Sequence, residues 1–252
     1  MSEAMRRLRI GVALAAAIAA LAAGTEARAD AQAALDRQAI GAIVREYLIE
    51  NPEVIEEAMR ALRANRDAAR QQVVRRVIER NRDALFSHPM TPVSGDSRGD
   101  VTLVEFFDYQ CGYCKRALGP MKELLAGDPK LRVAWKEFPI LGPASRFAAR
   151  AALAAARQGR YLDFHLAVMG ARGNPTESSV VAIAEDLGLD VERLRRDMAD
   201  PAIEAYLDET NRLARDLGIT GTPAFVIGDT LVPGAVGIAR LRQLIADVRA
   251  GG

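Results

Sequence analysis

The sequence contains two cysteines, Cys111 and Cys114, which are separated by Gly112 and Tyr113. Loop-closure entropy grows with the number of residues enclosed, so a disulfide across two residues would stabilise a fold only weakly. The spacing suits redox chemistry better, because a thiolate of Cys111 can attack a substrate disulfide and Cys114 can then resolve the mixed disulfide. We therefore predict a redox-active disulfide between Cys111 and Cys114.

Metal binding is the competing use of these two thiols. A structural zinc site takes four ligands, and besides the cysteines the chain offers only His88 and His165 as soft or imidazole ligands. We expect no structural metal and no other cofactor. Two adjacent thiolates would nevertheless suit Cu(I), so copper handling through Cys111 and Cys114 stays open as an alternative.

The cysteines follow directly on a predicted strand and open a predicted helix. Residues 101–107 are largely apolar, as in a central strand, whereas residues 115–125 have a helical pattern. A second strand is expected over residues 131–138, which makes a strand–helix–strand unit with a right-handed crossover. Cys111 would lie at the N-terminus of the helix, where free N–H groups and the helix dipole favour thiolate over thiol.

The remainder of this domain is predicted to be mostly helical. Residues 143–217 show successive helical patterns, and sheet pattern returns only at residues 224–227 and 231–232, which we expect to pair as a hairpin. Residues 238–248 close the chain as a helix. The predicted fold class is therefore α/β, with a helical insertion between the two halves of the sheet.

Residues 106–115, Phe-Phe-Asp-Tyr-Gln-Cys-Gly-Tyr-Cys-Lys, resemble the active-site segment of the DsbA family of thioredoxin-fold proteins. The resemblance extends over roughly residues 101–248 and includes Thr222 and Pro223 ahead of the hairpin. It implies a thioredoxin fold, a cis proline at Pro223 beside the cysteines, and backbone pairing of its loop with substrate.

A buried acid that transfers protons precedes the cysteines in that family, and Glu105 matches its position. The residue is an acid in an otherwise apolar strand, where burial would raise its pKa and let it exchange a proton with Cys114. A carboxylate satisfied by local hydrogen bonds is the alternative interpretation.

The residues between the cysteines suggest the direction of the chemistry. Strongly oxidising DsbA proteins carry Pro-His there, whereas Gly112 and Tyr113 together with Thr222 and Pro223 resemble the combination in DsbC-type isomerases. We expect these four residues to contact substrate and the protein to be a milder oxidant than DsbA. The predicted function is a disulfide isomerase or reductase; the alternatives are a DsbA-like dithiol oxidase and a Cu(I)-binding copper-tolerance protein.

A helical arm is predicted over residues 30–86, interrupted where Asn51 would cap a new helix that starts at Pro52. Its apolar stripe cannot be buried by the arm alone, so it packs either on the main domain or on a second copy. Residues 47–53 resemble the N-terminal region of the ScsC (suppressor of copper sensitivity) proteins, some of which form trimers through it. We expect a homo-oligomer, dimer or trimer, and a linker over residues 87–99, which are rich in Pro and Gly.

Residues 1–29 have the layout of a secretory signal peptide, with a basic region formed by Arg6, Arg7 and Arg9, then an apolar run, and a cleavage site ending at Ala29. The expected location is therefore the periplasm, and the expected substrates are exported proteins with disulfides. Reduction of the cysteine pair implies a membrane-bound partner of the DsbD or ScsB type. The formal net charge of +1 and the absence of basic blocks argue against nucleic-acid binding.

Overall fold

The computed structural model describes residues 37–251, so the predicted signal peptide lies outside the described residues. The chain divides into an N-terminal unit that ends at Asp67 and a C-terminal unit that starts at Ala68. Residues 37–50 are helical, and after a break the chain continues as α2 (Glu53–Arg80) and the short helix α3 (Arg82–Phe86).

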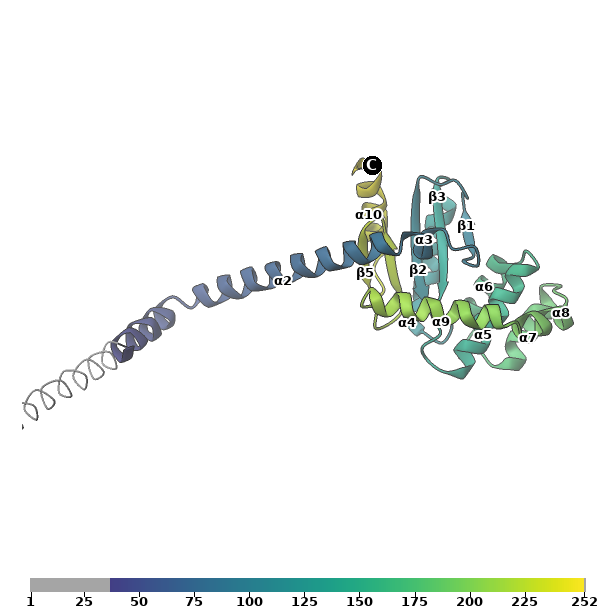
Figure 1. The fold of residues 1–252 in the computed structure, drawn as a ribbon, viewed down its shortest axis with the longest axis horizontal. Helices are drawn as coiled ribbons and strands as arrows, with labels where there is room; N and C mark the ends of the chain where they lie inside the picture. Colours follow the sequence, from purple (N-terminus) through teal and green to yellow (C-terminus); the bar gives the residue numbers. More distant parts are fainter. Residues whose placement is uncertain (1–36, 252) are drawn as a thin grey trace, which may run out of the picture. The chain divides into compact units, whose positions relative to one another are not determined.

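The C-terminal unit is built on a five-stranded sheet in the order β1-β3-β2-β4-β5 (Figure 1). The strands are β1 (Val93–Gly95), β2 (Val101–Phe107), β3 (Leu131–Glu137), β4 (Ala224–Ile227) and β5 (Thr230–Pro233). Strands β2 and β3 are parallel and joined through helix α4 (Gly112–Gly127), while all other pairs are antiparallel. This is the predicted strand–helix–strand unit followed by the predicted hairpin, and it confirms the thioredoxin fold.

Alternate residues of the central strand β2 point to the two faces of the sheet, as a period of two requires. Leu103 and Phe107 pack on one face in the larger core, together with helix α4 and the C-terminal helix α10 (Ile238–Gly251). Val104 and Phe106 pack on the other face with residues of α3 and of the C-terminal end of α2. Both faces are thus covered, which explains why β2 is an almost continuous apolar run.

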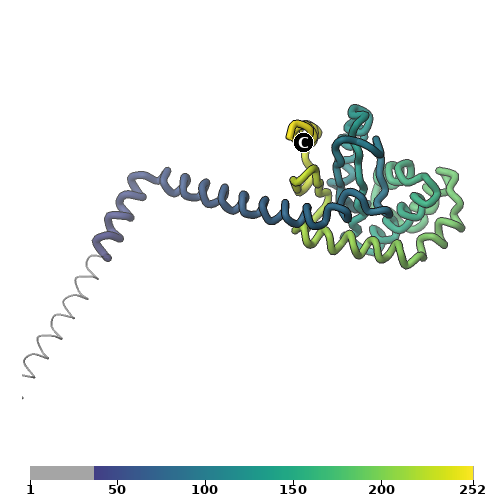
Figure 2. The backbone as a smooth tube through the Cα atoms, turned by 45° about the horizontal axis from the view of Figure 1, so that its top comes forward, coloured from purple at the N-terminus to yellow at the C-terminus, as the bar shows by residue number. Residues whose placement is uncertain are grey.

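Five helices lie between β3 and β4 and confirm the predicted helical insertion. They are α5 (Pro143–Arg157), α6 (Tyr161–Gly170), α7 (Glu177–Asp186), α8 (Val191–Met198) and α9 (Pro201–Asp216). Asp190 and Asp200 cap α8 and α9 through their side chains, which accept hydrogen bonds from the N–H groups of Arg193 and Ala202. Figure 2 shows α9 returning from the group α5–α8 towards the sheet, where it packs against β3.

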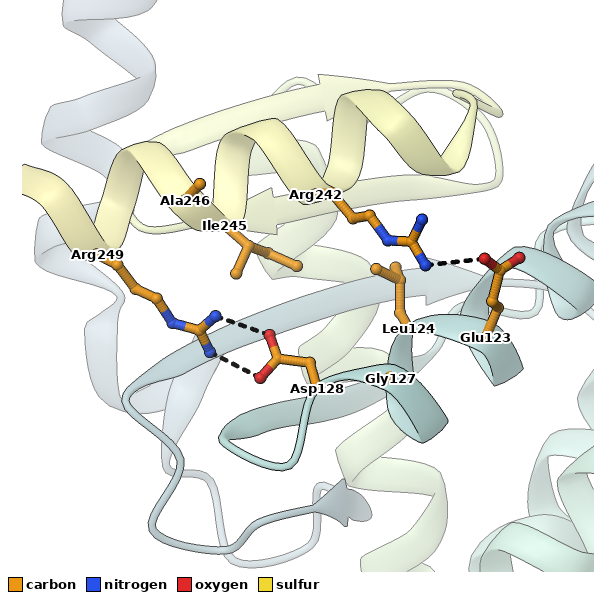
Figure 3. A pocket seen from close by; sticks show the side chains of 8 residues that line it. All are labelled: Glu123, Leu124, Gly127, Asp128, Arg242, Ile245, Ala246 and Arg249. Carbon is orange, nitrogen blue, oxygen red and sulfur yellow. Dashed lines mark hydrogen bonds and ion pairs between the residues drawn. The ribbon is translucent and has the colours of Figure 1, made fainter.

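The C-terminal helix α10 is attached to α4 by ion pairs (Figure 3). Arg249 pairs with both Asp100 and Asp128, each at 2.8 Å, and Arg242 pairs with Glu123 at 2.8 Å. The two guanidinium groups thus fasten one side of α10 to the C-terminal half of α4.

Two local predictions differ from the structure. The segment expected to be a linker, residues 87–99, contains β1, an edge strand of three residues that is too short to produce an alternating pattern. Asn51 does not cap α2 with its side chain, because its amide donates to the carbonyl of Tyr47 at 2.9 Å in the preceding turn. The helix therefore begins at Glu53 and not at Pro52.

A buried lysine joins β3 to the segment before the sheet. The Lys136 Nζ donates to the carbonyl of Ala84 and to the Thr91 hydroxyl, each at 2.6 Å, and lies over the ring of Tyr206. Burial lowers the pKa of Lys136 to about 7; the charge of Glu209 opposes this shift and that of Arg132 adds to it. The sequence analysis did not identify this role, because a lysine in a strand is ordinarily solvent-exposed.

Large apolar side chains of the N-terminal unit are exposed. The relative exposure is 64 % at Ile43, 55 % at Tyr47 and 51 % at Ile55. Ile43 and Tyr47 are four residues apart, so they lie on the same face of the helix formed by residues 37–50.

Candidate functional site

Cys111 lies at the N-terminus of α4, at the point where β2 ends and the helix begins. It occupies the capping position with extended backbone angles, φ −74° and ψ 113°, and the backbone N–H of Cys114 donates to its sulfur at 3.4 Å. Both residues are free thiols, with exposed fractions of 7 % for Cys111 and 1 % for Cys114. The first sulfur is therefore the accessible one, and the second is covered one turn further along the helix.

The loop before β4 contacts the first cysteine, although 111 residues separate them in sequence. The peptide bond between Thr222 and Pro223 is cis, and the Cys111 thiol donates to the Thr222 carbonyl at 3.2 Å. The Pro223 carbonyl is already engaged by the N–H of Gly234 at 2.9 Å. The structure thus brings Thr222 and Pro223 to Cys111, the arrangement that the resemblance implied.

Glu105 is buried in β2 on the face that packs against α4. Burial is the main cause that raises its pKa to about 8, and the charge of Cys111 is the second. Burial also raises the pKa of Cys114, which the nearby charge of Glu105 reinforces and a backbone N–H of Asp108 opposes. Glu105 and Cys114 therefore influence each other inside the protein, and both prefer to be protonated in the resting dithiol.

Gly112 and Tyr113 form the exposed turn between the cysteines. The Tyr113 side chain is 60 % exposed, and the guanidinium of Arg116 lies 4.2 Å from the centre of its ring. This stack orients an aromatic surface next to Cys111. An exposed aromatic ring beside a reactive sulfur can contact an unfolded polypeptide.

The sequence analysis missed several residues around the site. Asp108 is fully buried and accepts hydrogen bonds from the N–H groups of Ile140 and Leu141, in the loop that follows β3. The side chains of these two residues are 39 % and 51 % exposed. Asp108 belongs to residues 106–115, the segment that resembles the DsbA family. Its partners lie in the loop after β3, and the sequence does not show that this loop is close to Asp108.

A second buried polar group, Glu137, is hydrogen-bonded to the cysteine loop through Tyr109. Glu137 accepts hydrogen bonds from the hydroxyls of Tyr109 at 3.1 Å and Tyr161 at 2.9 Å, and the Tyr109 oxygen is 3.2 Å from Nδ1 of His165. Burial raises the pKa of Glu137 well above its usual value and lowers that of His165 to about 3. The cluster ties Tyr109, two positions before Cys111, to β3 and α6.

Neither histidine lies in a metal site of the described residues. His165 is buried in the aromatic cluster around Trp135, and His88 stacks against Tyr206 and lies 3.4 Å from Glu209. Within residues 37–251, no group of three or more His, Cys, Asp or Glu is arranged to hold a metal ion. In the same residues, no helix combines the length and the hydropathy needed to cross a membrane.

The fold and the cysteine pair define a thioredoxin-fold protein with a dithiol at a helix N-terminus. Residues 102–246 match the DSBA-like thioredoxin domain, and residues 36–69 match the copper resistance protein ScsC N-terminal domain. The chain therefore belongs to the DsbA-like thioredoxin family and carries an ScsC-type N-terminal region. It is a thiol–disulfide oxidoreductase of the DsbA/ScsC type.

Solved structures support this assignment. A thioredoxin-like oxidoreductase from Silicibacter pomeroyi is 49 % identical, with a TM-score of 0.66, and the match covers 68 % of this chain and 98 % of that one. BcfH from Salmonella enterica Typhimurium is 29 % identical, with a TM-score of 0.73, and the match covers 88 % and 99 %. ScsC from Proteus mirabilis in a transitional conformation is 30 % identical, with a TM-score of 0.66, and the match covers 87 % of this chain and 99 % of that one.

The curated relatives are longer proteins of another kind. A Na(+)/H(+) antiporter NhaA from Salinispora arenicola is 30 % identical over 161 residues, which cover 63 % of this chain. The matched region spans only about a quarter of that antiporter. The likeness therefore concerns one region of those proteins and carries no transport function to this chain.

Proposed function

We propose that this protein is an oligomeric disulfide isomerase or reductase that acts on exported proteins in the periplasm. The observation that supports this most directly is the Cys111 thiol, which lies at a helix N-terminus against the carbonyl of Thr222 with buried Glu105 behind it. The arrangement combines an accessible sulfur, a backbone carbonyl next to it and an internal proton acceptor in one site.

The reaction starts when the Cys111 thiolate attacks one sulfur of a substrate disulfide. A mixed disulfide forms, and the other substrate sulfur leaves as a thiolate. In isomerisation, a substrate thiolate attacks the substrate sulfur of the mixed disulfide, which forms a new substrate disulfide and releases Cys111 as a thiolate. In reduction, Glu105 in its ionised form takes the proton of Cys114; formation of the mixed disulfide favours that form because it removes the charge of Cys111, the second cause that raises the Glu105 pKa. The Cys114 thiolate then attacks the sulfur of Cys111 and displaces the second substrate sulfur as a thiolate, so that the pair becomes oxidised and the substrate becomes a dithiol.

The surface around Cys111 supports a protein substrate. Tyr113, beside Cys111, and Ile140 and Leu141, in the loop bound by Asp108, are large exposed apolar residues. A misfolded polypeptide exposes apolar side chains beside its wrong disulfides, so such a surface binds it without requiring a defined sequence. Gly112 leaves the approach to the sulfur open, since it has no side chain.

Reduced cysteines are required for isomerisation, so the proposal includes a membrane-bound electron donor of the DsbD or ScsB type. The proposal also includes oligomerisation through residues 30–86, supported by the exposed apolar residues of the N-terminal unit and by the ScsC N-terminal match. Several copies of Cys111 around one client would raise the effective concentration of thiol. A relative from Salmonella enterica is described as a periplasmic thioredoxin-like protein, which supports the proposed location.

Refolding of scrambled ribonuclease tests the function. We expect recovery of ribonuclease activity with the reduced protein in a glutathione buffer, and none with Cys111→Ser. A protein that instead oxidises reduced ribonuclease rapidly, and does not recover activity from the scrambled form, is a DsbA-like oxidase and refutes the isomerase proposal.

Copper handling is the second candidate, supported by the two adjacent thiols and by the copper-resistance domain that residues 36–69 match. Substitution of either cysteine cannot separate the two functions, because both need the thiols. Pro223→Ala can, because a polypeptide contacts this loop and a Cu(I) ion bound by two sulfurs does not. Tight Cu(I) binding by both the unsubstituted protein and Pro223→Ala, with no refolding activity in either, would favour the copper function.

A further inference from the structure

We propose that Asp108 is a positioning residue for Cys111, which holds the cysteine loop and the neighbouring loop of residues 138–142 in one arrangement. The inference rests on the proposed role of Cys111 as the attacking thiol. It arises from a buried carboxylate at the centre of hydrogen bonds that come from separate segments of the chain.

The side chain of Asp108 is satisfied by three segments. Its Oδ1 accepts from the N–H of Gln110 at 2.7 Å and from the hydroxyl of Ser145 at 2.6 Å. Its Oδ2 accepts from the N–H groups of Ile140 and Leu141, each at 2.9 Å. The donors therefore belong to the cysteine loop, to the loop after β3 and to the first turn of α5.

The carboxylate and the Ser145 hydroxyl are removed from water. Asp108 is 1 % exposed and Ser145 is 0 % exposed, and the Ser145 hydroxyl also accepts from the side-chain amide of Gln110 at 2.7 Å. None of the four donors to Asp108 is a charged group, so the carboxylate is held by oriented dipoles alone. Charge-assisted hydrogen bonds of this kind are short and strong, and a buried set of them fixes the geometry of its donors.

The backbone of Asp108 faces both cysteines. Its carbonyl accepts from the N–H of Cys111 at 3.0 Å, and its own N–H favours the thiolate of Cys114. Gln110, whose N–H the carboxylate binds, directly precedes Cys111. Asp108 thus holds Gln110 through its side chain and Cys111 through its backbone carbonyl, at the point where the chain turns into α4.

This placement has a chemical consequence. The thiolate of Cys111 depends on N–H groups at the start of α4, and these groups point at the sulfur only while Cys111 keeps its capping geometry. If the loop were less rigid, the N–H groups at the start of α4 would point at the sulfur less consistently. They would then stabilise the thiolate of Cys111 less. Asp108 therefore acts through the loop and touches neither the substrate nor the reacting sulfur.

Replacing Asp108 by asparagine distinguishes the effect of the loop geometry from the effect of the carboxylate charge, because the two shift the thiolate equilibrium of Cys111 in opposite directions. Asparagine has one oxygen, which the two N–H groups of Ile140 and Leu141 can retain, while its amide nitrogen faces the N–H of Gln110 and cannot accept from it. The Ser145 hydroxyl can accept from that nitrogen, so only the bond to the cysteine loop is lost. Removal of a negative charge by itself favours the nearby thiolate, whereas loss of the loop geometry disfavours it.

The experiment measures the rate of Cys111 alkylation by iodoacetamide against pH in the reduced full-length protein, with mass spectrometry to assign the modified cysteine. For Asp108→Asn we expect the midpoint of the rate profile to rise by about one pH unit, so the rate below the midpoint falls roughly tenfold. Ser145→Ala removes two hydrogen bonds, the one to Asp108 and the one from the Gln110 side chain, and leaves the charge unchanged. It should shift the midpoint upwards by a smaller amount, because the backbone N–H groups still hold Asp108.

Asp128→Asn is the matched control, since that carboxylate binds Arg249 away from the cysteines (Figure 3). It should leave the midpoint in place even though it weakens an ion pair. A midpoint that falls or does not move in Asp108→Asn overturns the proposal, and if that variant does not fold, an unchanged midpoint in Ser145→Ala does the same. Alkylation needs no protein substrate, so a failure of the isomerase assay in the unsubstituted protein would refute the proposed function separately.

Discussion

Replacing Glu105 by glutamine should change the pH dependence of stability in a direction that the structure specifies. Glutamine has the shape of a protonated glutamate, so the exchange removes a titration without creating a cavity. Burial raises the pKa of Glu105 from 4.5 to about 8 in the folded protein. Between these two values the folded state holds a proton that the unfolded state has released.

The sign follows from the proton balance. Because the unfolded state binds fewer protons in this range, the stability of the unsubstituted protein falls as pH rises from 4.5 to 8. A shift of this size corresponds to about 5 kcal/mol at 1.36 kcal/mol per pKa unit, as an order of magnitude. The glutamine variant lacks this loss, so it should equal the unsubstituted protein near pH 5 and exceed it by several kcal/mol at pH 8.

The assay is urea denaturation of both proteins at a series of pH values in dithiothreitol, which keeps the cysteines reduced as in the structure. His165, whose pKa burial lowers to about 3, destabilises the fold as pH falls below 6.5. It is present in both proteins, so its contribution cancels in the difference. Glu123→Gln, an exposed carboxylate on α4, serves as the control for the substitution itself.

A difference in the free energy of unfolding that stays constant from pH 5 to pH 8 would refute the reasoning. It would mean that the Glu105 carboxylate is solvated or paired in solution. Its role as the proton acceptor for Cys114 would then lose its physical basis, because an acceptor of ordinary pKa cannot take a proton from that buried thiol efficiently.

Four further predictions concern the cysteine pair, the substrate surface, the N-terminal arm and the core. Cys114→Ser should accumulate a mixed disulfide between Cys111 and a scrambled client, visible on a non-reducing gel; its absence would count against Cys114 as the resolving thiol. Leu141→Ser should raise the KM for an unfolded client several-fold and leave the equilibrium with glutathione unchanged, and an equal change in both would show that the residue acts on the cysteines. Ile43→Glu, on the exposed face of the N-terminal unit, should convert an oligomer to a monomer in light scattering, whereas an unsubstituted protein that is already monomeric removes the oligomer proposal. Tyr161→Phe deletes one hydrogen bond to a buried carboxyl and should lower the free energy of unfolding by about 1 kcal/mol, and no loss in urea denaturation would mean that the hydroxyl is not bonded in solution.

The sequence predicted the parts of this protein that depend on local pattern. The largely apolar residues 101–107 and the sheet pattern of residues 224–227 predicted strands, and the successive helical patterns of residues 143–217 predicted the helical insertion. Two predictions were wrong, one because a strand was too short to show a pattern and the other because a side chain had another hydrogen-bond partner nearby. A three-residue edge strand leaves no period to detect, and the amide of Asn51 found a partner in the preceding turn.

What sequence by itself determined is therefore the redox pair: two cysteines one helical turn apart, following a strand, with no other thiol in the chain. What only the tertiary structure decided is the environment of that pair. The Thr222 carbonyl reaches Cys111 across 111 residues, and Asp108 collects donors from segments up to 37 residues away. Burial and proximity between distant segments set the pKa of Glu105 and the geometry of the loop, and these are properties of packing that no local pattern encodes.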